Sequence, residues 1–198
     1  DDVFTPEDHR LAPSRYFEDF KLGEVFNIPS RTVTEAQCLA FQAASGDNHP
    51  IHYDREFCRR HGHPELLAHG YQVLIQTAAG AGLFPFMVEE SLMGFVEQSS
   101  RFLKPVYAGD TLYPRLTVSD LKPQRTTGVL TLASAVHNQK RELVLDGVQK
   151  FYSAAGPRAL PAAAAARGPP LVAPRRCIHR APIAVARFGL LWHTRNTV

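Results

Sequence analysis

Residues 45–54 read SGDNHPIHYD, and this segment places a carboxylate, Asp47, five positions before an imidazole, His52. On an unbroken helix such a pair would point in different directions, because only residues three or four apart share a face. Gly46 predicts the end of the preceding helix, since glycine accepts a positive φ. Pro50 disfavours helical backbone at the residue before it. We therefore expect a turn that aims an acid and a base at one water molecule, as adding water to a double bond requires.

Helical segments are predicted on both sides of this turn. Thr34 and Gln37 form a capping-box pattern, in which each side chain satisfies a backbone amide at the start of a helix. We expect a helix behind them that Gly46 ends. Asp54 is a candidate N-cap for a short second helix over residues 55–60.

The uncharged segment over residues 70–88 predicts a buried helix. Its apolar side chains recur at helical spacing, and small or apolar residues fill its other faces. A helix that is apolar on nearly every side must be enclosed, so we expect one central helix inside a soluble core. Gln72, Gln76 and Pro85 argue against a transmembrane helix, and no membrane attachment is expected.

The rest of the body has the pattern of β-strands. One strand is expected over residues 24–33, with an interruption at Pro29. Four more are expected after the uncharged segment, over residues 95–102, 111–119, 127–136 and 142–152. Pro114 lies inside the second of these four and indicates a sheet edge or a bulge. The expected fold class is therefore α+β, with an antiparallel sheet wrapped around a central helix.

Charge divides the chain into a body and a tail. Residues 1–154 contain 15 Lys and Arg against 19 Asp and Glu, whereas residues 155–198 contain seven Arg and no acid. Positive charge confined to a tail is not the footprint of a nucleic-acid-binding fold, so no nucleic-acid partner is expected. We predict an N-terminal arm over residues 1–22, one domain over 23–153 and a flexible Ala/Pro/Arg-rich tail over 154–198.

Cysteine and histidine usage bears on compartment and metals. Cys38, Cys58 and Cys177 form no CxxC pair, and their odd number argues against a disulfide framework or a zinc ribbon. A reducing, cytoplasmic location fits this usage. Five histidines between residues 49 and 69 invite a metal-site interpretation, but their spacing matches no common ligand pattern. We therefore expect no metal.

Three motifs occur in order along the chain. The first is residues 45–54, the second is Ala68-His69-Gly70, and the third is FLKPVYAGDTL over residues 102–112. Together they resemble the MaoC-like dehydratase family, which includes the (R)-specific enoyl-CoA hydratases (hydratase 2) with the hotdog fold. The resemblance covers about residues 16–152. One departure is His49, since the commonest form of the family motif has Asn before the proline.

The resemblance implies reversible addition of water to a trans-2-enoyl-CoA, which yields an (R)-3-hydroxyacyl-CoA. Asp47 and His52 would be the catalytic pair that holds the water. The backbone N–H of Gly70, at a helix start, would bind the thioester oxygen as negative charge develops on it. The acyl-CoA is the substrate, and no further cofactor is implied. The family also implies a homodimer or higher homo-oligomer, with acyl-CoA along the subunit interface, in fatty acid metabolism.

Five further residues are candidates for substrate binding. Ser45 is expected to act through hydrogen bonds within the loop, and His49 to line the acyl pocket or pair with Asp54. His69 is a candidate as a member of the second motif, Ala68-His69-Gly70. Arg101 and Lys104 are candidates for contacts with the CoA phosphates, or else belong to a solvated basic rim.

Other interpretations stay open from the residues alone. A hotdog acyl-CoA thioesterase would need a carboxylate or a Ser/Thr nucleophile on the central helix, and residues 70–88 contain no acid. A non-catalytic acyl-CoA-binding subunit would keep the fold without the activity, and the intact acid and base argue against it. In the plainest interpretation Asp47 organises a turn and His52 is a satisfied core histidine.

Overall fold

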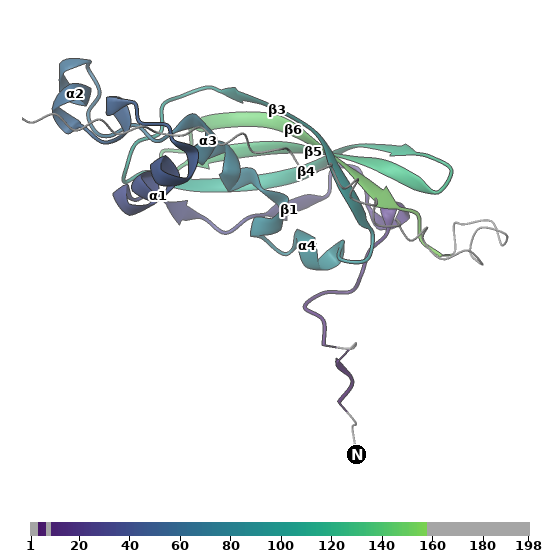
Figure 1. The fold of residues 1–198 in the computed structure, drawn as a ribbon. Helices are drawn as coiled ribbons and strands as arrows, with labels where there is room; N and C mark the ends of the chain where they lie inside the picture. The colour runs from purple at the N-terminus through teal and green to yellow at the C-terminus, as the bar shows by residue number, and fades with distance from the viewer. Residues whose placement is uncertain (1–3, 7–8, 158–198) are drawn as a thin grey trace, which may run out of the picture.

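An antiparallel sheet forms the frame of the protein in the computed structural model, which describes residues 4–6 and 9–157 (Figure 1). Its strands run in the order β1-β4-β5-β6-β3, and the short β2 pairs with β4 beyond β1. Their bounds are β1 Val25–Asn27, β2 Arg31–Thr32, β3 Leu92–Phe102, β4 Thr111–Pro123, β5 Thr127–Asn138 and β6 Leu143–Ala154. The predicted α+β class is confirmed, and each predicted strand is present with ends that differ by a few residues.

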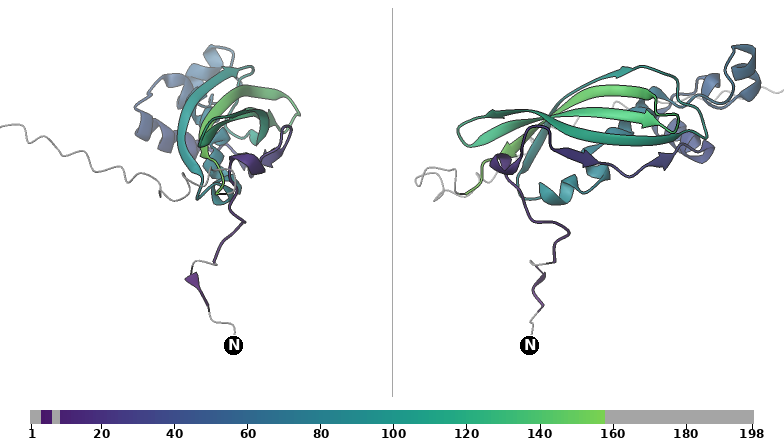
Figure 2. Two further views of the ribbon diagram at one scale, coloured as in Figure 1. Left: turned by 90° about the vertical axis from the view of Figure 1, so that its right-hand side faces the viewer. Right: turned by 180° about the vertical axis from the view of Figure 1, so that it is seen from behind.

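Short helices lie against one face of this curved sheet (Figures 1 and 2). The elements that build the loop region are α1, η3 and α2, and those of the uncharged segment are α3, η4, η5 and α4. Their bounds, with the N-terminal η2, are η2 Phe17–Asp19, α1 Glu35–Ser45, η3 Pro50–His52, α2 Arg55–Arg60, α3 Gly70–Leu74, η4 Ile75–Thr77, η5 Ala79–Ala81 and α4 Phe84–Met87. Both predicted caps are confirmed, because Thr34 accepts a hydrogen bond from the Gln37 amide and Asp54 accepts one from the Phe57 amide.

The prediction of a single central helix over residues 70–88 is wrong, because four short helical segments occupy this part of the chain. Ala78 has extended ψ of 123°, so the helical hydrogen-bond ladder stops there. The Thr77 hydroxyl donates to the Leu74 carbonyl at 2.8 Å and satisfies one of the acceptors left at that break. Gly82 adopts an extended conformation, and a Cβ there would lie 3.1 Å from the Asn27 carbonyl oxygen. Close packing against β1 therefore sets the path of this segment.

Two buried clusters hold the helical segments on the sheet. One lies beneath α4 and consists of Phe20, Ile28, Phe84, Val88, Leu116, Val118, Leu130, Leu132 and Phe151. The other lies beneath α1 and α3 and consists of Val33, Cys38, Ala68, Val73, Val106, Leu112, Val136, Val144 and Leu145. Burial of these apolar side chains is the main force that fixes the helices. The second cluster fixes α1, after which residues 45–54 follow, and α3, which begins at Gly70.

Pro114 does not mark the edge that the sequence indicated, since β4 lies between β1 and β5. The neighbouring strand is interrupted there instead. β1 ends at Asn27, β2 begins at Arg31, and the Ile28 amide donates to the Pro114 carbonyl at 3.0 Å. Proline has no backbone N–H to donate, and Pro114 lies where the neighbouring strand is interrupted.

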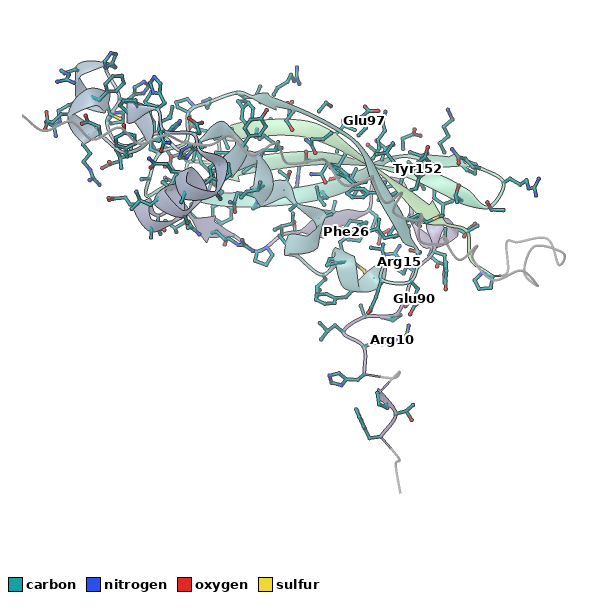
Figure 3. All side chains as sticks on the ribbon, in the orientation of Figure 1. Arg10, Arg15, Phe26, Glu90, Glu97 and Tyr152 are labelled. Carbon is teal, nitrogen blue, oxygen red and sulfur yellow. The ribbon has the colours of Figure 1, made fainter. Side chains whose placement is uncertain are left out.

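The N-terminal residues contact the body through arginine side chains (Figure 3). Arg15 lies 2.6 Å from a Glu24 carboxylate oxygen, and its guanidinium is 4.4 Å from the centre of the Phe20 ring. The hydrogen bond from Arg15 lowers the pKa of Glu24 below its usual value. Arg10 forms a second ion pair, with Glu90 at 3.6 Å. The division into arm, domain and tail stays a prediction, and nearly all of the expected tail lies outside the described residues.

Two further expectations concern cysteines and membranes. Cys38 and Cys58 are buried free thiols, as expected, and Cys177 lies outside the described residues. Within the described part of the chain, no helix combines the length and the apolar character that crossing a membrane would take.

Candidate active site

The loop over residues 45–54 turns as its glycine and proline predict. Gly46 has a φ of 74°, and its N–H donates to the Gln42 carbonyl at 2.9 Å, which ends α1. His49 has φ −67° and ψ 132°, the extended conformation favoured before a proline. Pro50 then begins η3, where its missing N–H costs nothing. The chain thus reverses between Asp47 and His52 instead of continuing as a helix.

This reversal brings the predicted acid and base together. The Asp47 carboxylate oxygen Oδ2 lies 3.8 Å from the His52 ring nitrogen Nε2. The Asp47 side chain is half exposed, whereas only 10% of the His52 side chain is exposed. A separation of 3.8 Å is too long for a direct hydrogen bond, but one water oxygen fits at about 2.8 Å from both atoms. The geometry therefore suits a shared water molecule.

Hydrogen bonding orients the His52 ring toward Asp47. Its other nitrogen, Nδ1, lies 2.7 Å from the Leu67 carbonyl oxygen, which can only accept. Nδ1 therefore carries the proton, and Nε2 presents a lone pair toward Asp47. Burial is the main reason that the pKa of His52 is lowered, and His69 adds to this effect while Leu67 and Asp47 oppose it. The ring is neutral at pH 7 and can accept a proton.

His69 contacts both Asp47 and His52. It is 1% exposed, and its ring stacks on the His52 ring with centroids 3.8 Å apart. Its Nε2 lies 3.1 Å from the Asp47 carbonyl oxygen, and its Nδ1 lies 3.3 Å from Gln72 Oε1. His69 is therefore placed to fix the loop backbone and the His52 ring. The sequence interpretation missed Gln72, a buried polar residue three positions after His69 on an otherwise apolar helix.

Gly70 begins α3 beside this cluster. Among the described residues its backbone N–H has no hydrogen-bond partner, as is usual for the first residues of a helix. Gly70 is exposed, and a Cβ placed there would lie 3.5 Å from the Phe102 ring of β3. An accessible N–H at a helix start, next to an acid and a base, offers a donor for a developing oxyanion.

The other candidate residues have partners of their own. The Ser45 hydroxyl accepts from the Asp47 N–H at 3.2 Å, and His49 Nδ1 accepts from the Ile51 N–H at 3.3 Å, so both shape the loop. Arg101 forms a two-point ion pair with Asp146, and Lys104 Nζ lies 2.6 Å from a Glu142 oxygen. These two cations are therefore paired with carboxylates.

One group of ligand-type side chains is found in the described residues, formed by Asp47, His52 and His69, with atoms within 4.8 Å of one another. Both ring nitrogens of His69 face oxygen acceptors. This leaves only two side chains, Asp47 and His52, with free ligand atoms in this group, and zinc sites use three or four protein ligands. The arrangement suits a water molecule better than a metal ion.

An apolar groove of about 370 Å³ starts where α3 ends. Residues of the broken central segment form one wall, and residues of β3 and β6 form the other. Its apolar lining includes Leu74, Ile75, Ala78, Phe84, Phe95 and Phe151. Leu74 is four residues beyond Gly70, a distance of about 6 Å along a helix. The groove therefore opens about one helical turn from the Gly70 N–H.

Sequence comparisons place this chain in a known group of proteins. Residues 19–140 match the family model described as the MaoC-like domain. Protein MaoC of Klebsiella aerogenes is 36% identical over 113 residues, which cover 54% of this chain but only 32% of that protein. The 3-hydroxybutyryl-CoA dehydratase of Methylorubrum extorquens is 29% identical over 67% of this chain and 80% of the relative. The (R)-specific enoyl-CoA hydratase of Rhodospirillum rubrum is 29% identical over 56% and 74%, respectively.

Solved structures agree with this placement. A monoamine oxidase regulatory protein from Archaeoglobus superposes with a TM-score of 0.69 at 28% identity, over 74% of this chain and 99% of that one. A Mycobacterium tuberculosis protein with a double hotdog fold gives 0.60 at 30% identity, over 73% and 45%. The family match spans well over half of the sequence, and the chain therefore belongs to the MaoC-like dehydratase family and has the hotdog fold.

Proposed function

We propose that this protein is a hydro-lyase that interconverts a trans-2-enoyl-CoA and an (R)-3-hydroxyacyl-CoA. The observation that carries the proposal is the approach of the Asp47 carboxylate to the free Nε2 of His52, at 3.8 Å. Relatives named as hydratases and dehydratases support the reaction class.

In the proposed mechanism a single water molecule lies between the two side chains. Neutral His52 accepts a proton from this water while its hydroxyl adds to C3 of the enoyl group. Negative charge then develops on the thioester oxygen, where the Gly70 N–H stabilises it. The proton returns to C2 from the same side, through the Asp47 and His52 pair. Dehydration follows the reverse path.

The apolar groove supports an acyl group longer than the four carbons of crotonate. The thioester carbonyl would lie at Gly70, and the groove begins about 6 Å away along α3. An acyl chain that extends past C4 would bury its methylenes there, at about 0.8 kcal/mol each. We therefore expect medium-length linear enoyl-CoAs to react with a higher kcat/KM than crotonyl-CoA.

An absorbance assay of the enoyl-thioester chromophore tests the reaction. We expect the purified protein to remove this chromophore from crotonyl-CoA and, more efficiently, from a linear eight-carbon substrate, with the (R)-alcohol as product. Release of free CoA without loss of the double bond would instead establish a thioesterase. Binding of enoyl-CoA without turnover would establish a non-catalytic subunit.

We also propose that two copies associate through β3. The helical segment expected to be enclosed is open in the single chain, since Tyr71 is 71% exposed and Ile75 52%. Among the described strands β3 pairs only with β6, so its other edge presents free backbone groups next to the exposed Met93, Phe95 and Phe102. Light scattering is expected to give a mass near twice 22.0 kDa. A monomer at micromolar concentration would refute this assembly.

A further inference from the structure

A second, polar pocket of about 600 Å³ lies on the opposite face of the sheet from the helices. Tyr113 and Arg115 of β4 line it and are exposed, whereas Leu112 and Leu116 on the other face of β4 belong to the buried clusters. Side chains alternate along a strand, so the pocket and the proposed active site are on opposite sides of the sheet. Nothing in the proposed hydration uses it.

Strand register brings the polar side chains of this pocket together. Asn27 of β1 lies opposite Arg115, and Tyr113 lies opposite His137 of β5. Residues directly opposite on neighbouring strands share a face. Arg141 joins them from the turn between β5 and β6, and Ser30 from the gap between β1 and β2. Between β1 and β2 the chain turns away from β4, beside Pro114, and this gap leaves room for the pocket.

Most of the polar side chains that line the pocket have no partner among the described residues, whereas Asn138 and Gln139 donate to the carboxylates of Glu142 and Asp110. Among the described residues no hydrogen bond or ion pair involves the side chains of Asn27, Ser30, Tyr113, Arg115, His137 and Arg141. In the part of the chain that the structure describes, no carboxylate lines the pocket. The neighbouring acids are already engaged, since Asp110 accepts from Gln139 at 2.6 Å and Glu142 is paired with Lys104. Two guanidinium groups therefore flank one pocket without a counter-charge.

Several other arginines form ion pairs with carboxylates, unlike Arg115 and Arg141. Arg15, Arg55, Arg59 and Arg101 each meet a carboxylate of the same chain. A guanidinium offers five N–H donors in a planar fork that matches phosphate oxygens. Two such forks with a tyrosine, a histidine and two small polar side chains form a donor-rich, cationic site. Its volume falls in the range of small-molecule pockets.

We propose that this outer-face pocket binds a small phosphorylated anion of nucleotide size. Arg115 and Arg141 would contact the phosphate oxygens, with Asn27 and Ser30 as additional hydrogen-bond donors. Tyr113, whose ring is 48% exposed, offers a flat surface on which a base stacks. The proposal does not depend on the hydratase reaction, because its residues lie on the other side of the sheet.

Isothermal titration calorimetry with inorganic pyrophosphate and with ADP tests the proposal on the full-length protein. We expect saturable binding of one anion per chain, weakened by added salt. The double variant Arg115→Gln/Arg141→Gln should bind pyrophosphate at least about tenfold more weakly. Arg125→Gln is the matched control, because Arg125 is an exposed arginine in the turn at the other end of β4 and β5. It should bind as the unchanged protein does.

Two further readouts separate the possible results. Tyr113→Ser should weaken ADP but not pyrophosphate if a base stacks there, and equal affinity of ADP and pyrophosphate would assign the pocket to the phosphate group alone. Absence of saturation up to millimolar ligand would overturn the proposal. So would unchanged affinity in a folded double variant, because the anion would then be bound elsewhere. Enoyl-CoA hydration by the double variant should stay at its original rate, which keeps this test separate from that of the active site.

Discussion

Two neighbouring stretches of the chain contain the same pair of residue types, and their side chains are used differently. Asp54 and His61 flank α2, only a few residues beyond Asp47 and His52. The Asp54 carboxylate accepts from the Phe57 N–H at 3.0 Å, and His61 Nδ1 lies 2.7 Å from the Phe57 carbonyl. Among the described residues, the Asp47 carboxylate has no hydrogen-bond donor. It lies close to the rings of His52 and His69.

The comparison indicates how the proposed catalytic pair differs from a structural one. At α2 the side chains of Asp54 and His61 satisfy free backbone groups at the two ends of the helix, which is a common structural role of such residues. In the loop, Ser45 and His49 satisfy the backbone amides and leave Asp47 Oδ2 and His52 Nε2 without partners. Side-chain atoms that have no partner in the folded chain remain available to contact a substrate.

The largest expected effect comes from removing that available pair. Asp47→Ala and His52→Ala should each lower kcat for enoyl-CoA hydration by about 100- to 10,000-fold, because an acid–base group contributes that much. Asp54→Ala should change kcat by less than about threefold, since its carboxylate only caps α2. The absorbance assay measures all three variants. Equal losses in Asp47→Ala and Asp54→Ala would remove the distinction between the two stretches.

The next largest effect concerns the Gly70 N–H. Gly70→Pro should lower kcat by about 100- to 1000-fold, because it deletes one oxyanion donor. Proline is well tolerated at the first position of a helix, and His69 already has the extended ψ of 139° that precedes proline. Gly70→Ala is the matched control, since its Cβ would make an ordinary 3.5 Å contact with Phe102. If both variants were equally slow, bulk rather than the lost N–H would be responsible.

A smaller effect on stability should show the reverse ranking of the two aspartates. Asp54→Ala removes a helix cap and should lower the free energy of unfolding by about 1 kcal/mol. Asp47→Ala removes no hydrogen bond and should change it by less than about 0.5 kcal/mol. Urea denaturation followed by circular dichroism compares them. A larger loss for Asp47 would mean that its side chain has a structural role.

The smallest effect is the position of the acidic limb in the pH profile. The ordinary pKa of histidine is near 6.5, and burial lowers the pKa of His52 below it. The ring therefore stays neutral as the pH falls to about 6.5. Protonation below that pH removes the base, and kcat/KM should be flat around pH 7 and decline only below about 6.5. A profile from pH 5 to 8 on one enoyl-CoA locates the limb. A decline that begins above pH 7 would be inconsistent with a buried neutral histidine.

Local rules were enough to predict the loop and its caps from sequence. Gly46, Pro50, Thr34 and Asp54 act on backbone within a few residues, so their effects follow from residue type. The breaks in the uncharged segment were not predictable, because the close approach of Gly82 to β1 depends on tertiary packing. Segments rich in small and apolar residues fit a helix and a packed irregular path equally well.

The contacts that support the pair were also beyond sequence reasoning. The stack of His69 on His52 and its hydrogen bond to the Asp47 carbonyl join residues 17 and 22 positions apart. Only the folded chain shows that Arg115 and Arg141 flank one pocket, since Arg115 lies in β4 and Arg141 in the turn between β5 and β6. Motif order identified the family and the candidate acid and base, whereas their supporting residues required the three-dimensional arrangement.

A double-mutant cycle on the hydration rate tests the central claim most directly. It compares the unchanged protein with Asp47→Ala, His52→Ala and the double variant on one enoyl-CoA. If both side chains act on the same water, the double variant should be no slower than the slower single variant, because removing either one already disables the pair. Losses that simply multiply, or a single variant with near-normal turnover, would contradict the account.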